Sequence, residues 1–219
     1  MLNKFFIRKI KLENENYYHV FNRGVDKRDI FLCKEDFERF LSCLKEFNRV
    51  EIIGSLKDLS INRSHSVASQ PPSGLVEIIA FCLNSNHYHL ILKQLIEGGI
   101  SKFMHKVSMG FAHYFNQKNK RSGALFQGAF EAYPINNEQK LAWLSAYVNC
   151  NYEIHKIGKA KDWSWSSYGD YMRIKPEMLC KKEVILSQFE SSEQYLDFCG
   201  KVIIEAKDIK IVQKYLLNQ

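Results

Sequence analysis

The chain has 219 residues, 46% of them apolar, which is enough to bury one sizeable core with a small appendage. Its net charge of +7, from 31 basic and 24 acidic side chains, by itself indicates only a mild preference for polyanions. Six cysteines without a C-x-x-C pair argue against a disulfide framework or a zinc ribbon, and no apolar run of about 18 residues is present, so we expect a cytoplasmic protein without membrane contact.

The first half of the chain predicts a strand, a helix and a β-hairpin. Residues 17–21 form a β-rich run that ends in the turn residues 22–24, and residues 36–47 have the apolar spacing of an amphipathic helix. Residues 55–74 are rich in Ser, Asn, Gly and Pro and predict a long mobile loop. Two strands follow at 76–83 and 87–93, joined by the turn-forming triplet 84–86.

The second half predicts mainly helices. Ser101 can cap a helix that runs to about Asn116, a basic loop spans 118–128, residues 129–135 resemble another strand, and Asn137 opens a further helix. An aromatic cluster at 162–168 should pack on the main domain. The remaining segments predict helices at 184–198, broken at 190–192, and at 203–217. We therefore expect a main domain over residues 1–175 and a helical extension over 176–219.

The tripeptide His87-Tyr88-His89 lies inside the second strand of the predicted hairpin. Side chains alternate along a strand, so the two histidines project from one face, about 7 Å apart at the backbone. They could hold one metal ion together, or they could simply be core histidines. Tyr88 falls on the opposite face, where we expect it to pack in a core and take no part in chemistry.

A second group of chemically capable residues lies on the predicted helix after Asn137. Tyr147 and Asn151 are four residues apart, so they share a helix face. Asn151 could supply a third metal ligand, and Tyr147 would then lie beside the same metal as a covalent nucleophile. The phenol has an ordinary pKa near about 10, so its deprotonation needs help from a metal or a base. A tyrosine in a helix can also serve packing alone.

The stretch from Gly98 to Phe130 contains no carboxylate. Its basic side chains are interleaved with aromatic ones, as on surfaces that hold phosphates and stack bases. The alternative is a helix whose solvated face happens to be basic. We expect contacts to DNA from this stretch, with Arg23 near the end of the sheet, through Lys102, Lys106, Lys118, Lys120 and Arg121.

Several motifs in this order resemble those of the single-tyrosine transposases of the HUH superfamily, of the insertion-sequence type. The set is closest to the transposase-like proteins associated with repetitive extragenic palindromes, and it covers about residues 15 to 170. The motifs are Tyr18-His19-Val20, Asn22-Arg23-Gly24, Ala80 to Leu92, Tyr114-Phe115-Asn116, Leu125 to Phe130, Ser145 to Asn151 and Trp163 to Tyr168.

The resemblance implies an α+β fold, with a ferredoxin-like or RRM-like antiparallel sheet carrying the histidine pair. It implies that His87, His89 and Asn151 bind Mg²⁺ or Mn²⁺ and that Tyr147 attacks a phosphate of single-stranded or hairpin DNA. The product would be a 5′-phosphotyrosine and a free 3′-hydroxyl, so that the strand could later be rejoined without ATP. The protein would be a monomer or a homodimer associated with the nucleoid.

Three departures from the family pattern bear on DNA preference. Asn84-Ser85 replaces the usual Met-Pro before Asn86, and Tyr152 replaces the proline that usually follows Asn151. Gln127, a DNA contact by resemblance, is followed by Gly128-Ala129 instead of Gly-Arg, so one DNA-contacting arginine is missing. The metal and nucleophile set is intact, so we expect the chemistry to survive.

Two other functions remain open from the residues. A non-catalytic module could bind single-stranded nucleic acid through the basic stretch on an RRM-like sheet. A hydrolytic metalloenzyme would need more ligands near His87, but His89 is followed by Leu90-Ile91-Leu92. A two-histidine phosphoesterase would need two H-x-[S/T] motifs, and only His65-Ser66 faintly resembles one.

Overall fold

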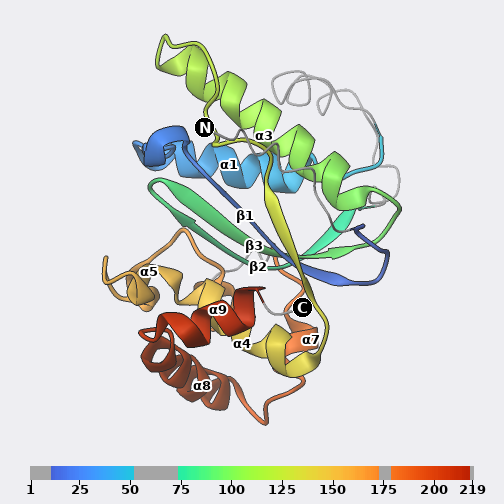
Figure 1. Ribbon diagram of the computed structural model, residues 1–219, viewed down its shortest axis with the longest axis vertical. Helices are drawn as coiled ribbons and strands as arrows, with labels where there is room; N and C mark the ends of the chain where they lie inside the picture. The colour runs from blue at the N-terminus through green and yellow to red at the C-terminus, as the bar shows by residue number, and fades with distance from the viewer. Residues whose placement is uncertain (1–10, 52–73, 173–178, 218–219) are drawn as a thin grey trace.

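The computed structural model describes residues 11–51, 74–172 and 179–217. Four antiparallel strands form one sheet in the order β2-β3-β1-β4, with helices on both of its faces (Figure 1). The strands are β1 (Tyr17–Arg23), β2 (Val76–Asn84), β3 (His87–Gln94) and β4 (Glu131–Ile135). The expected α+β class is therefore confirmed. The expected loop at 55–74, including His65, lies outside the described residues except for Gly74.

The strand register brings together the end of β2, the start of β3 and the end of β1. Asn84 pairs with His87 across the hairpin, and His87 pairs with Arg23 on its other side. His89 lies between Cys82 and Phe21. Since strand neighbours on one face touch, residues far apart in the sequence meet around the two histidines.

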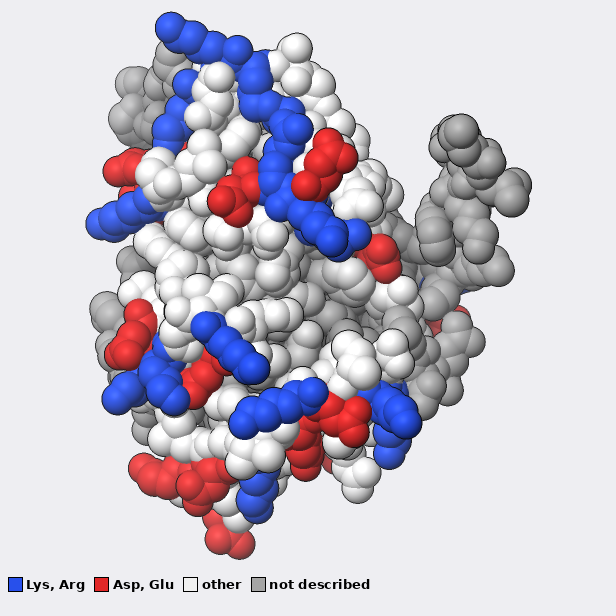
Figure 2. Space-filling view, turned by 60° about the vertical axis from the view of Figure 1, so that its left-hand side comes forward, with Lys and Arg blue, Asp and Glu red and all other residues white. Residues whose placement is uncertain are grey.

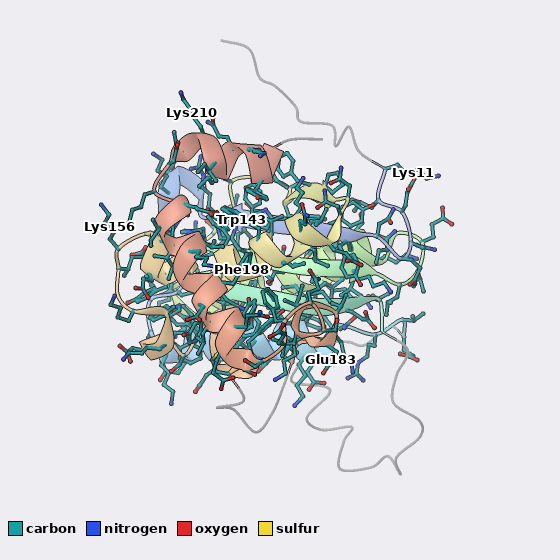
Figure 3. The ribbon with its side chains drawn as sticks, turned by 90° about the horizontal axis from the view of Figure 1, so that it is seen from below. Lys11, Trp143, Lys156, Glu183, Phe198 and Lys210 are labelled. Atoms are coloured by element: carbon teal, nitrogen blue, oxygen red, sulfur yellow. The ribbon has the colours of Figure 1, made fainter. Side chains whose placement is uncertain are left out.

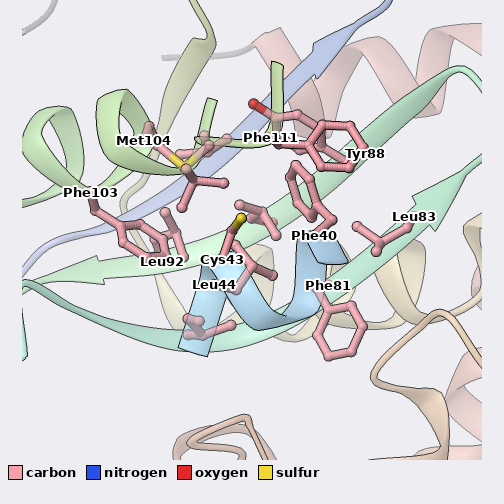
Figure 4. Packing of buried hydrophobic residues seen from close by; sticks show 14 of the residues in the cluster. Phe40, Cys43, Leu44, Phe81, Leu83, Tyr88, Leu92, Phe103, Met104 and Phe111 are labelled. Carbon is pink, nitrogen blue, oxygen red and sulfur yellow. The ribbon is translucent and has the colours of Figure 1, made fainter. Parts of the chain in front are cut away.

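One face of the sheet is covered by α1 (Lys34–Glu46) and α3 (Gly99–Lys118), the upper layer in Figure 1. Figure 4 shows the rings of Phe40, Tyr88 and Phe111 meeting between this layer and the sheet. Tyr88 is fully buried, as expected, with its ring 5.0 Å from that of Phe40. Gly110 allows α3 to pass close to α1, because a Cβ there would lie 2.6 Å from Phe47 Cε2.

The opposite face is covered by α4 (Glu138–Asn149) and by the helices that follow it. Figure 3 looks up at this layer, which contains α5 (Asn151–Ile154), α6 (Tyr168–Tyr171), α7 (Glu183–Leu186), α8 (Ser192–Glu205) and α9 (Ile209–Leu217). Trp143 of α4 stacks on Tyr215 of α9, with ring centroids 4.1 Å apart. Its indole N–H also donates to Glu205 Oε2 over 2.8 Å. The C-terminal helices thus share one apolar cluster with α4.

Several expected element boundaries were wrong. The helix expected from Ser101 begins at Gly99, because Gly98 adopts a positive φ of 68° and Gln94 Oε1 accepts from the Ile100 N–H. The helix expected over 203–217 is two helices, and the side chain of Asp208 accepts from the Lys210 N–H at the start of the second. The last strand begins at Glu131, two residues later than expected, because its pairing with β1 starts at Glu131, opposite Phe21.

The two outer strands of the sheet differ in how they are covered. Segments after α5 lie along β2, since Leu83 N–H donates to Trp165 O and Lys181 N–H donates to Ile78 O. The other outer strand, β4, is five residues long and contains Pro134. Within the described residues, no helix is long and apolar enough to cross a membrane.

Candidate active site

His87 and His89 project from the face of the sheet that α4 covers. Their ring centroids lie 5.1 Å apart, and the ring planes are nearly perpendicular. His89 is buried and His87 is half-buried. The period-two alternation of β3 therefore gives the shared face that the sequence predicted.

Tyr147 and Asn151 reach the same place from the helical layer. The Tyr147 ring lies 6.0 Å from that of His89, perpendicular to it, and only 5% of the residue is exposed. The single helix expected over both residues was wrong, because α4 ends at Asn149, and Cys150, with φ −99° and ψ 9°, separates it from α5. Asn151 nevertheless faces the hairpin, where its Oδ1 accepts from Asn84 Nδ2 over 2.7 Å.

Asn84 is a member of this site that the sequence had suggested only as a turn residue and as a departure from the family pattern. It ends β2 opposite His87, and only 1% of it is exposed. Its amide nitrogen donates both to Asn151 Oδ1 and to His87 Nε2, over 2.7 and 3.0 Å. The register of the hairpin, which the turn length sets, could have indicated this pairing.

The side chain of Asn86 selects the tautomer of His87. The amide oxygen Oδ1 of Asn86 lies 2.6 Å from His87 Nδ1 and can only accept, so Nδ1 carries the proton. His87 Nε2 therefore presents its lone pair to the site, where the Asn84 amide donates to it. The ring of His155, an exposed residue of the segment after α5, lies 5.6 Å from that of His87.

His19 of β1 lies behind His89 and was missed in the sequence. It is fully buried, and its Nε2 is 2.9 Å from His89 Nδ1, with the two rings nearly parallel. Burial, together with the nearby charge of Lys140, lowers the pKa of His19 from 6.5 to about 3. In the sequence it appeared only as part of the motif Tyr18-His19-Val20, with no role in the site.

The histidines of this cluster are neutral at neutral pH. Burial, with repulsion from His155, lowers the pKa of His87 to about 4, and burial holds the pKa of His89 well below 6.5. Neutral imidazole is the form that binds metals. Burial also raises the pKa of Tyr147, and this effect outweighs that of the nearby Asn151 side chain, which lowers it, so the phenol keeps its proton.

The predicted DNA contacts divide into three groups by position. Arg23 and Gln127 lie together beside His87, because Arg23 Nε donates to Gln127 Oε1 and the Gln127 N–H donates to Arg23 O. Lys102 and Lys106 lie on α3, in the layer on the other face of the sheet. Their ammonium groups donate to backbone carbonyls, Lys106 to Arg49 O over 2.9 Å.

The remaining basic residues surround the loop after α3. Lys118 forms an ion pair of 2.7 Å with the buried carboxylate of Asp36, so its charge is already balanced. Arg121 donates to Asn116 Oδ1 and to Ala124 O, whereas the side chain of Lys120 is exposed. Figure 2 shows Lys and Arg side chains over the upper part of the face it presents, with acidic side chains among them.

Residues 67–151 match the family model for IS200-like transposases. The resemblance to the IS200-like transposases is confirmed. The matched segment includes His87, His89, Tyr147 and Asn151, which the fold brings together. No curated protein sequence matches the chain.

A solved structure with a similar fold is that of a REP-associated tyrosine transposase bound to a REP hairpin. The two chains are 15% identical, and the match covers 78% of this chain and 87% of the other, with a TM-score of 0.53. At this identity the similarity shows a common fold.

Proposed function

We propose that this protein is a metal-dependent single-stranded DNA endonuclease and strand transferase, acting on hairpin-bearing DNA through a covalent 5′-phosphotyrosine at Tyr147. The observation that carries the proposal is the convergence of a strand pair, His87 and His89, with Tyr147 and Asn151 from the helical layer. The IS200-like match and the hairpin bound by the similar solved structure support DNA as the substrate.

The residues present fit a divalent cation such as Mg²⁺ or Mn²⁺. In the described part of the chain, no three His, Cys, Asp or Glu side chains are grouped to hold a metal, and the proposed set therefore takes an amide oxygen as its third ligand. His87 Nε2 and Asn151 Oδ1 already converge on one positively polarised group, the Asn84 amide. His87, His89 and Asn151 would hold the ion, which would polarise the scissile phosphate.

The chain's own residues define the covalent step. The Tyr147 hydroxyl oxygen forms a bond to phosphorus while the bond from phosphorus to the 3′-oxygen breaks. The phenolic proton passes to solvent or a base, and the departing 3′-oxygen gains a proton. Because Tyr147 is 5% exposed, the groups around its hydroxyl must move for a phosphate to reach it.

The direct test uses a single-stranded hairpin oligonucleotide with Mn²⁺, labelled at one end. A label at the 3′ end should become attached to the protein and withstand denaturant, whereas a 5′ label should leave on a free fragment. Tyr147→Phe should form no adduct. Tyr152→Phe is the matched control, because Tyr152 stacks on Trp163 at 3.9 Å and has no place in the proposed step.

The results separate this proposal from simple binding. DNA binding without an adduct at any metal concentration would favour the non-catalytic alternative. An adduct that persists in Tyr147→Phe would show that another residue is the nucleophile. Loss of the adduct with a chelator and its return with Mg²⁺ or Mn²⁺ is the expected sign of metal dependence.

A further inference from the structure

A column of aromatic rings leads from the candidate site toward the edge of the sheet. The rings of His89 and His19 are stacked at 5.1 Å, those of His19 and Phe21 at 5.1 Å, and those of Phe21 and Tyr133 at 5.9 Å. The strand register explains the column, because His89 pairs with Phe21 and His19 pairs with Tyr133. All four side chains therefore share the face that carries His87.

The far end of this column is accessible. The helix α4 packs mainly against β2 and β3, on the other half of the sheet, and reaches β4 at its first turn, where Lys140 Nζ donates to Pro134 O over 3.1 Å. His19 is fully buried, but Phe21 and Tyr133 are half-buried, and Arg23 and Glu131 beside them are exposed. Among the described residues, Phe21 contributes the one ring that stacks on Tyr133.

We infer that Tyr133 is a stacking platform for a base of single-stranded DNA next to the scissile phosphate. This rests on the proposed function and names a substrate contact for the same site. Aromatic rings on a sheet face hold single-stranded nucleic acid by base stacking, which every base allows. The column joins Tyr133 to His89 through successive ring contacts across neighbouring strands, so a stacked base lies close to the site.

The charges around the platform orient the strand. The Tyr133 hydroxyl donates to Glu131 Oε2 over 3.0 Å, so a carboxylate lies beside the ring. A carboxylate repels a phosphate but accepts from the amino group of a base. Arg23 lies on the same face at the end of β1. The base therefore lies over Tyr133, and the phosphates pass on the side of Arg23.

Binding measured without cleavage tests the platform. The Tyr147→Phe protein, in buffer with chelator, is titrated with a fluorescent single-stranded hairpin oligonucleotide. Adding Tyr133→Leu should weaken binding about 5- to 150-fold, the usual effect of losing one stacked base. Tyr133→Phe keeps the ring and loses only the bond to Glu131, so it should bind like the parent. Urea unfolding confirms that each variant is folded.

A base analogue gives a second readout that a change in stability would not alter. With 2-aminopurine placed in turn at positions on each side of the scissile phosphate, stacking should quench its fluorescence at one position, both in the parent and in the Tyr133→Phe variant. Tyr133→Leu should restore the fluorescence at that position. Parent and Tyr133→Leu proteins that bind equally, or no quenching at any position, would overturn the platform alone. Absence of any DNA binding would overturn the proposed function with it.

Discussion

Lowering the pH from about 7 to about 5 should cost the metal-free protein about 2 kcal/mol of stability through His19 alone. Burial holds the pKa of His19 near 3, against an ordinary value of 6.5. At pH values between these two pKa values, His19 binds a proton in the unfolded chain but not in the folded protein. The contribution is therefore complete above pH 6.5 and is lost as the pH falls toward 3. Each pH unit in that window costs about 1.4 kcal/mol per proton.

Urea unfolding at several pH values, with chelator present, measures this loss. His87 and His89 should add to it in the same direction, since burial also lowers their pKa values. His19→Gln should reduce the pH slope by about one proton. His105→Gln is the matched control, because His105 is exposed on α3 and meets solvent in both states. Equal slopes for the parent and His19→Gln would refute a neutral, buried His19.

Other consequences concern packing and charge. Gly110→Ala should lower the free energy of unfolding by about 1 to 3 kcal/mol, because the added methyl meets the ring of Phe47, the residue that ends α1. Gly200→Ala, in the helix α8 with open space around the methyl, should raise the free energy of unfolding by up to about 1 kcal/mol. Urea unfolding of both variants measures the difference. Asp36→Asn should lower the free energy of unfolding by about 2 kcal/mol, because this buried carboxylate accepts from Lys118 and two backbone N–H groups. Thermal unfolding measures the loss, and an unchanged melting midpoint would contradict that role. Lys120→Ala should reduce the slope of the log DNA-binding constant against log salt by about one unit, and Lys118→Ala by less, because the charge of Lys118 is already paired with Asp36. Equal reductions in the two variants would contradict this role of the ion pair.

Local sequence patterns were enough to predict the structural features that depend on a single segment of the chain. The alternation along β3 separates His87 and His89 from Tyr88, and the apolar spacing of α4 places Tyr147 toward the sheet. Turn residues predicted the hairpin, whose turn consists of the two residues Ser85 and Asn86. These predictions were reliable because the geometry of a strand or a helix fixes them without reference to the rest of the chain.

Contacts between distant segments could not be predicted in the same way. His19 reaches His89 only because β1 lies between β3 and β4, and no local sequence pattern determines that strand order. The ion pair between Lys118 and Asp36 joins residues 82 positions apart. The carboxylate-free stretch suggested that all its lysines were available to DNA, but the partner of Lys118 lies outside that stretch.

The coverage of the two outer strands limits how this protein can associate with itself. Edge strands with free N–H and C=O groups invite pairing with another chain, and proteins block them with proline, short strands or covering segments. Here β2 is bonded to Trp165 and Lys181, and β4 is short and carries Pro134, which has no N–H to donate. A homodimer of this protein would therefore form through helices or loops, and growth of the sheet into an aggregate is disfavoured at both edges.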